Sequence, residues 1–84
     1  DAADAYKRGD YKESHRLWLP FAKQGDAEAQ CNLGMMYVKG EGVAQDYKEA
    51  EKWFRLAAKQ GNATAQANLA LMHDDSLDCL NSPN

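Results

Sequence analysis

The sequence is poor in the residues that build β-sheets. It contains no isoleucine, and its β-branched side chains are limited to Val38, Val43 and Thr64. Strands favour branched side chains, whereas helices favour Ala, Leu, Lys, Glu and Gln. Alanine alone occurs fourteen times. The composition therefore argues against a sheet and predicts an all-α protein.

The chain also lacks a long apolar run and an excess of positive charge. Its longest apolar stretch, Leu17 to Ala22, is interrupted by Pro20 and is far too short to span a bilayer, so we expect no membrane insertion. Ten Lys and Arg stand against thirteen Asp and Glu, a net charge of −3. Without a basic field to displace counterions, nucleic-acid binding is disfavoured.

Cysteine is scarce as well. Cys31 and Cys79 are too few to build a disulfide scaffold. The 84 residues allow one domain of marginal stability. The chain begins at Asp1 with neither Met nor an apolar leader, which indicates either a trimmed chain or a processed mature form.

What the chain does contain is an internal repeat. At an offset of 36 residues, positions 10–36 align with positions 46–72 without a gap, and 14 of the 27 pairs are identical. Asp10 and Asp46 begin the matched segments, and Gly25 falls on Gly61. A period of this length is typical of a stacked array of supersecondary units.

Each unit is predicted to contain two helices joined by short turns. Asp10 and Asp46 are predicted N-caps, each followed three residues later by a glutamate that would complete a capping box (Glu13 and Glu49). Gly25 and Gly61 suit the left-handed position that ends a helix. Asp26 and Asn62 cap the next helix at once. The predicted helices cover residues 2–8, 11–24, 27–38, 47–60 and 63–73, with a bend and no break at Pro20.

Apolar residues recur at helical spacing on both helix types. One stripe contains Ala29, Leu33, Met36 and Tyr37, and its repeat contains Ala65, Leu69 and Met72. A broader packing stripe contains Ala50, Trp53, Phe54, Ala57 and Ala58, with Leu17, Trp18, Phe21 and Ala22 as its counterpart. The many alanines allow close helix approach, and the large aromatic side chains fill the remaining gaps.

A set of residues at fixed spacing extends the pattern across a whole unit. They are Ala29, Leu33, Gly34, Tyr37, Gly40, Glu41, Gly42, Val43, Asp46, Lys48, Ala50, Trp53, Phe54, Ala57, Ala58, Gly61 and Ala63. In these residues the chain resembles the Sel1-like repeat, a branch of the tetratricopeptide superfamily with a unit of the same length. The resemblance implies an all-α, right-handed superhelix of about five helices in antiparallel pairs, an α-solenoid whose concave face binds other proteins. The run Gly9, Asp10, Tyr11 looks like the opening of arrays on exported bacterial proteins, which implies a periplasmic or secreted location, with the cytoplasm as the alternative.

The repeat sets the expected domain organisation. Residues 1–73 form the array, with a partial unit at 1–25, a full unit at 26–61 and a partial unit at 62–73. Residues 74–84 form an acidic tail, either frayed or folded as a cap over the last helix. Cys31 is either a small apolar residue facing a neighbouring helix, one half of a Cys31–Cys79 disulfide in an exported chain, or a reactive thiol.

The expected binding residues lie beside the apolar stripe, on the side that faces the groove in this superfamily. They are Glu28, Asn32, Met35 and Val38, followed by Thr64, Asn68 and Leu71, with Cys31 and Ala67 on the same side. Met35 and Leu71 share a repeat position and suit a partner's apolar side chains, while the amides of Asn32 and Asn68 suit an extended backbone. Alternatively, the two amides bond the adjoining helix and Met35 and Leu71 pack between repeats. No Lys or Arg is among these residues, which disfavours a C-terminal carboxylate as the ligand.

Signals for catalysis, cofactors and metals are weak. Gly40, Glu41 and Gly42 predict a turn with positive φ and no phosphate loop, because no Lys-Ser or Lys-Thr follows. The acidic and sulfur ligands after His73 match no metal site, and His15 is expected on a solvent-facing surface with an ordinary pKa of about 6.5. We therefore expect no enzyme, metal or cofactor, and a protein-interaction module that binds another protein or peptide. The alternatives are a structural fragment that forms a homo-oligomer through exposed repeat ends and, less favoured, a small hydrolase.

Overall fold

The computed structural model describes residues 1–73, which form five α-helices and no strand. The predicted all-α class is confirmed, and every predicted helix boundary falls within one residue of the observed one. The helices are α1 (Ala2–Lys7), α2 (Tyr11–Lys23), α3 (Ala27–Lys39), α4 (Tyr47–Lys59) and α5 (Ala63–His73). Helix α2 continues through Pro20 to Lys23, so the proline does not break it.

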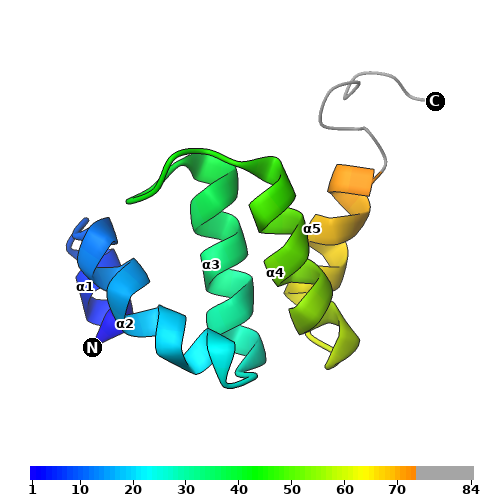
Figure 1. The fold of residues 1–84 in the computed structure, drawn as a ribbon, viewed down its shortest axis with the longest axis horizontal. Helices are drawn as coiled ribbons and strands as arrows, with labels where there is room; N and C mark the ends of the chain where they lie inside the picture. The colour runs from blue at the N-terminus through cyan, green and yellow to red at the C-terminus, as the bar shows by residue number, and fades with distance from the viewer. Residues whose placement is uncertain (74–84) are drawn as a thin grey trace.

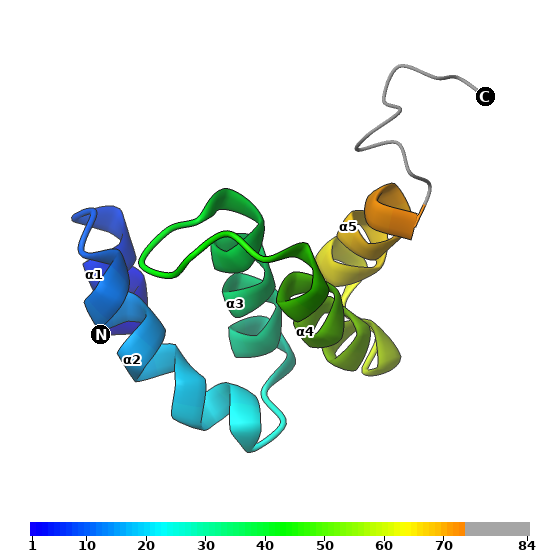
Figure 2. The same cartoon turned by 45° about the horizontal axis from the view of Figure 1, so that its top comes forward.

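The helices follow one another as a row of antiparallel neighbours. Each helix packs mainly against the helices before and after it in the chain, from α1 at one end to α5 at the other (Figure 1). Figure 2 shows the same order from a second direction. This nearest-neighbour packing is the arrangement of a solenoid.

Glycine ends helices α2 and α4 in the same way. Gly25 and Gly61 have φ of 105° and 90°. The amide of Gly25 donates to the carbonyl of Ala22, and that of Asp26 donates to Phe21. The corresponding bonds of Gly61 and Asn62 go to Ala58 and Ala57. These are the paired bonds of a Schellman motif, so the predicted stop signals are confirmed.

The predicted caps are confirmed at three helix starts and wrong at one. Asp26, Asp46 and Asn62 accept backbone N–H groups of the first turn of α3, α4 and α5. Asp10 makes no such bond at α2, and its carboxylate lies 4.0 Å from Arg8.

In a capping box the glutamate side chain also accepts the backbone N–H of the N-cap residue, and this bond is absent at both Asp10 and Asp46. Glu13 pairs with Arg16, and Glu49 pairs with Lys52. The backbone N–H groups that the glutamates were expected to reach donate elsewhere, that of Asp10 to Ala5 and that of Asp46 to Tyr37. Ion pairing one turn along the helix has replaced the capping bond.

Two buried clusters hold the row together. The first joins α2, α3 and α4 through Ala22, Ala29, Leu33, Met36 and Trp53. The second joins α3, α4 and α5 through Cys31, Ala50, Phe54, Ala57 and Ala65, with half-buried Leu69 packed against it. Leu33 is fully buried. The predicted apolar stripe of α3 and its repeat on α5 both face the core. Gly34 lies directly beneath the ring of Phe54, where a Cβ would come within 2.6 Å of the ring.

Hydrogen bonds of side-chain amides repeat with the same period. Nε2 of Gln30 donates to the carbonyl of Ala22 over 2.9 Å, and Nε2 of Gln66 donates to Ala58 over 3.1 Å. Nε2 of Gln60, at the end of α4, in turn donates to Oε1 of Gln30 on α3 over 3.0 Å. This bond joins the end of α4 to α3. The carbonyls of Ala22 and Ala58 also accept the backbone N–H groups of Gly25 and Gly61, so each side-chain amide adds a second bond at a helix end.

The loop between α3 and α4 packs back onto the start of the array. Gly40 and Gly42 have φ of 72° and 76°, which confirms the predicted turn. A Cβ at Gly42 would lie 2.7 Å from the carbonyl carbon of Tyr11, so the loop backbone can approach α2 only as glycine. Next to it, the hydroxyl of Tyr6 donates to Glu41 over 2.7 Å, and this bond raises the pKa of Tyr6 to about 12.

Candidate interaction groove

Three hollows follow one another along α3, and together they form a feature that we call the groove. The N-terminal hollow, of about 290 Å³, is lined by Asp1, Ala2, Ala3, Trp18, Phe21, Asp26, Glu28, Ala29 and Asn32. The middle hollow, of about 250 Å³, is lined by Ala3, Tyr6, Lys7, Trp18, Asn32 and Met35. The C-terminal hollow, of about 90 Å³, is lined by Met35, Val38, Phe54, Asn68, Leu71 and Met72. Asn32 belongs to the first two hollows and Met35 to the last two, so neighbouring hollows share a lining residue.

Helical periodicity explains why these residues share one face. The four α3 positions at 28, 32, 35 and 38 advance by three or four residues, which keeps them on one side of a 3.6-residue helix. Ala29, Leu33 and Met36 are offset from them and lie buried in the first core cluster. The residues beside the apolar stripe are therefore left open on the groove side.

Six of the seven predicted binding residues line the groove. Glu28, Asn32, Met35 and Val38 do so from α3, and Asn68 and Leu71 from α5. Thr64 is exposed but does not line these hollows. The structure thus brings the two predicted sets together, and their role in binding stays a prediction.

The contacts of the two asparagines differ. Nδ2 of Asn68 lies 3.3 Å from Sδ of Met35, so this amide bonds the adjoining helix, as the alternative interpretation expected. Asn32 makes no side-chain hydrogen bond within residues 1–73, and its half-buried amide is open to the groove. Of the two apolar positions, Met35 is half-buried and packs against the second core cluster, whereas Leu71 is 51% exposed.

The groove has an aromatic wall that sequence reasoning missed. Phe21 was expected in a packing stripe, but that expectation is wrong, because its side chain is 55% exposed. Trp18 is half-buried, with its ring 5.8 Å from that of Tyr6. Helix α1 has six residues and packs less extensively on α2 than α3 packs on α4. One signal could have shown this: Phe21 aligns with Ala57, so the large ring at position 21 has no aromatic counterpart in the repeat.

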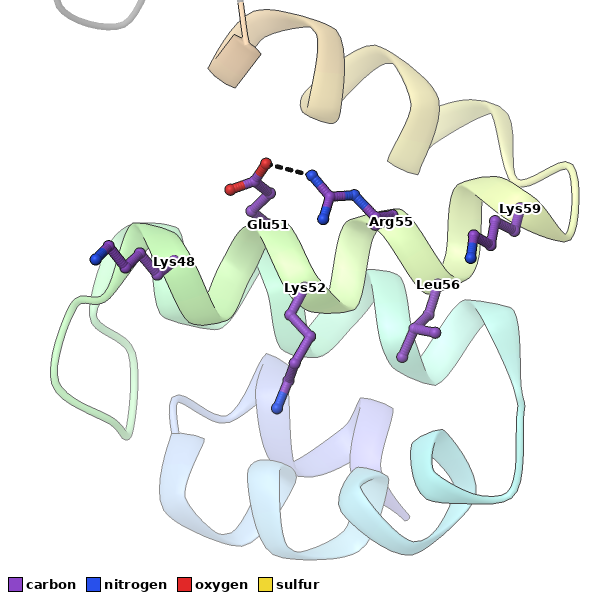
Figure 3. Close-up of a pocket in the computed structure, with 6 residues that line it drawn as sticks. All are labelled: Lys48, Glu51, Lys52, Arg55, Leu56 and Lys59. Carbon is purple, nitrogen blue, oxygen red and sulfur yellow. Dashed lines mark hydrogen bonds and ion pairs between the residues drawn. The ribbon is translucent and has the colours of Figure 1, made fainter.

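Charges are distributed unevenly between the groove and α4. Asp26 and Glu28 line the N-terminal hollow and form no ion pair within residues 1–73. A separate hollow of about 160 Å³ on α4 is lined by Lys48, Glu51, Lys52, Arg55, Leu56 and Lys59, and it shares no residue with the groove. Figure 3 shows these side chains along the helix, with Glu51 accepting a 2.6 Å bond from Arg55. The α4 face is therefore basic.

The family model of the Sel1 repeat matches residues 27–62 and 63–84. These two spans cover more than half of the chain. The chain belongs to the Sel1 repeat family. No curated protein and no solved structure matches it. Sel1 repeats form helical solenoids, are generally non-catalytic and typically mediate protein interactions.

The matched spans place the first full Sel1 repeat one residue later than our predicted unit at 26–61. That unit pairs α3 with α4, and the second match begins with α5. The second match continues to residue 84, through the segment predicted as a tail or cap. That segment lies outside the described residues.

Cys31 of the Sel1 repeat is a core residue and does not face the groove. It is 5% exposed and lies in the second core cluster with Ala50, Phe54 and Ala65. Burial, with a smaller effect of Glu28, raises the pKa of its thiol. This supports the interpretation of Cys31 as a small apolar side chain and disfavours a reactive thiol. Cys79 lies outside the described residues, so the Cys31–Cys79 disulfide stays a prediction.

His15 is not the solvent-facing residue that we expected. Its Nε2 lies 3.3 Å from the hydroxyl of Tyr37, and the two rings meet edge to face at 5.8 Å. Burial between α2 and α3 lowers the pKa of His15, against a smaller opposing effect of Glu49. The histidine thus belongs to the packing between repeats.

Two further features bear on the chemistry of the described residues. No group of three or more His, Cys, Asp or Glu in residues 1–73 is placed to hold a metal ion. Among the same residues, no helix has the length and apolarity needed to cross a membrane.

Proposed function

We propose that this Sel1 repeat chain is a non-catalytic adaptor or regulator that binds a segment of another protein in the groove. The observation that carries the proposal is the run of three hollows along α3, which share Asn32 and Met35 and contain most of the predicted binding residues. A flat helix face would offer a partner no such row of recesses.

The C-terminal hollow is suited to anchor an apolar side chain. Met35, Val38 and Met72 line it together with the ring of Phe54, and Leu71 stands half-exposed beside them. Burying one aliphatic side chain of a partner contributes about 1.5–3 kcal/mol. Methionine side chains are adaptable and suit such a contact.

The open amide of Asn32 supplies the polar part of the site. It lies between the N-terminal and middle hollows and has no hydrogen-bond partner within residues 1–73. A side-chain amide offers both a donor and an acceptor, which matches the alternating N–H and C=O groups of an extended backbone. An apolar anchor with one such polar contact is the usual composition of a peptide-binding site.

A matched pair of substitutions tests the proposal. Leu71 is 51% exposed in the groove, and Leu56 is 40% exposed on the α4 face. Peptides are selected on the parent chain from a displayed library of random 12-residue sequences, and their affinity is measured by calorimetry. We expect Leu71→Asp to weaken binding at least tenfold and Leu56→Asp to change it less than twofold, with helicity retained in both. Equal effects, or a loss with Leu56→Asp alone, would place the binding site elsewhere.

Self-association is the second candidate, and the exposure of Leu71 favours it too. Helix α5 is the last of the described helices and packs mainly on α4, and Leu71 on it stays exposed, so this apolar surface is suited to a second copy. Sedimentation over a range of concentrations separates the two candidates. A monomer that binds selected peptides supports the interaction module, whereas a dimer that Leu71→Asp converts to monomer, with no peptide binding, supports the structural role.

A further inference from the structure

The N-terminal hollow differs chemically from the C-terminal one. Two aromatic side chains, Trp18 and Phe21, line it from α2, and two carboxylates, Asp26 and Glu28, line it from the start of α3. The C-terminal hollow contains no charged residue. A single extended ligand therefore meets an aromatic, acidic recess at one end of the groove and an apolar recess at the other.

The two carboxylates have charge to offer a ligand. Oδ1 of Asp26 accepts the backbone N–H of Ala29 over 3.1 Å, which leaves its second oxygen uncommitted. Glu28 is exposed, and neither carboxylate pairs with a cation within residues 1–73. The N-terminal end of α3 adds only about half a positive charge. Two full negative charges outweigh it, so this hollow favours a cation.

The aromatic rings select the type of cation. A guanidinium can stack on the face of an indole or phenyl ring and still present its N–H groups to a carboxylate in the same plane. The stem of the same side chain is apolar enough to lie against a ring as exposed as Phe21. Asn32, at the junction with the middle hollow, then meets the backbone that follows.

We propose that the groove recognises a basic–apolar segment of its partner, with an arginine in the N-terminal hollow and an aliphatic side chain in the C-terminal hollow. This inference rests on the proposed function and gives the ligand its chemistry. Glu28 and Met35 are seven residues apart on α3, which at about 1.5 Å per residue is about 10 Å. An extended chain rises about 3.3 Å per residue. The arginine and the aliphatic residue therefore lie three or four positions apart in the partner.

The α4 face provides the internal control. It is lined by four cationic side chains and one glutamate, so it repels an arginine (Figure 3). A control variant should lose two negative charges, as a variant without Asp26 and Glu28 does, but leave the groove unchanged. Two carboxylates on the outer surfaces of α2 and α4 can be removed for this purpose. Glu13 and Glu51 suit this purpose, because neither lines the groove and each pairs with an arginine of its own helix.

The experiment compares two double variants on the same selected peptides. Asp26→Asn with Glu28→Gln removes the two carboxylates that line the N-terminal hollow from the start of α3, and asparagine retains the helix cap. Glu13→Gln with Glu51→Gln is the control of equal charge. We expect the enriched peptides to carry Arg three or four residues from Leu, Ile or Met. We expect their dissociation constants to rise at least tenfold on the groove variant and less than twofold on the control. Replacing the peptide's arginine by citrulline should reproduce the loss on the parent chain and add little on the groove variant.

Three results would overturn the inference. They are enriched peptides without a shared cation, an equal effect of the two double variants, or a citrulline peptide that binds as tightly as its arginine parent. If Leu71→Asp still abolishes binding in any of these cases, the groove is a binding site with a different ligand and the proposed function stands. If Leu71→Asp has no effect either, both proposals fail.

Discussion

Gly34 on α3 lies against the ring of Phe54 on α4 in the full Sel1 repeat, and replacing it by alanine tests this packing directly. The added Cβ would lie 2.6, 2.7 and 2.9 Å from three ring atoms of Phe54. Ordinary carbon contacts are roughly 3.5–4.0 Å, so the overlap is about 1 Å. Phe54 is fully buried, and its ring cannot withdraw without moving α4 away from α3.

The expected magnitude follows from two opposing effects. Alanine is the better helix former by about 1 kcal/mol, which favours the variant. Overpacking of a core costs about 1–3 kcal/mol and sometimes more, and contact with three atoms of a fixed ring belongs at the upper end, about 3 kcal/mol. Gly34→Ala should therefore lower the free energy of unfolding by about 2 kcal/mol. For a domain of this size, that corresponds to a fall of about 8–16 °C in Tm.

The assay is thermal and urea unfolding followed by far-ultraviolet circular dichroism. Ala70, the repeat equivalent of Gly34, is exposed, so Ala70→Gly should cost only about 1 kcal/mol through helix propensity. Combining Gly34→Ala with Phe54→Leu should cost less than the sum of the two single changes, because the smaller side chain relieves the overlap. A Gly34→Ala chain that is as stable as its parent would refute the close approach of α3 and α4.

Three further predictions concern single side chains. Asp46→Ala should lower the free energy of unfolding by about 1 kcal/mol, because Asp46 caps two backbone N–H groups. Asp10→Ala should lower it by less than about 0.5 kcal/mol, because Asp10 makes no capping bond. Equal losses of the two variants in urea unfolding would contradict this assignment of the caps. Burial lowers the pKa of His15, so the unfolded chain binds its proton more tightly and stability should fall as the pH drops below 6.5. The Tm of His15→Gln should then change less than that of the parent between about pH 7.5 and about pH 5.5, and an unchanged pH dependence would exclude this role. The thiol of Cys31 should resist an alkylating reagent until the chain unfolds, and fast labelling of the native reduced protein would disprove its burial. A Cys31–Cys79 bridge, if it forms in an exported chain, should appear as a mass lower by two hydrogens.

Local signals explain why the helices could be predicted so closely. The stops at Gly25 and Gly61 need only a left-handed residue, and the caps at Asp26 and Asp46 need only a nearby N–H group. Neither depends on what the rest of the chain does. The repeat then doubled the signal, because each local pattern occurred twice.

Features that depend on competing partners could not be predicted in this way. Asp10 has the same local sequence as Asp46, yet it lies beside Arg8 and leaves its helix uncapped. His15 was expected in solvent because its own helix is polar around it, but Tyr37 on the next helix covers it. Such contacts join segments far apart in the sequence, which periodicity does not report.

Only part of the groove could be predicted from the sequence, because some of its residues depend on contacts between distant segments. The α3 residues Asn32 and Met35 follow from helix geometry and from the groove side that the family resemblance implies, and the structure places them in the groove. The aromatic wall depends on how much of α2 the helix α1 covers, and this contact between segments is not reported by periodicity. Phe21 was therefore expected in a packing stripe although it is exposed in the N-terminal hollow, whereas Trp18 lines this hollow and also packs against the first core cluster.

The most direct test of the account is to map a bound peptide by nuclear magnetic resonance. Isotope-labelled chain is titrated with one selected peptide, and shifts of the backbone amides and of the Trp18 indole N–H are followed. We expect the largest shifts at Asn32, Met35, Leu71 and Trp18, along the three hollows beside α3. Shifts concentrated on the outer face of α4, from Lys48 to Lys59, would contradict the claim that the groove is the binding site.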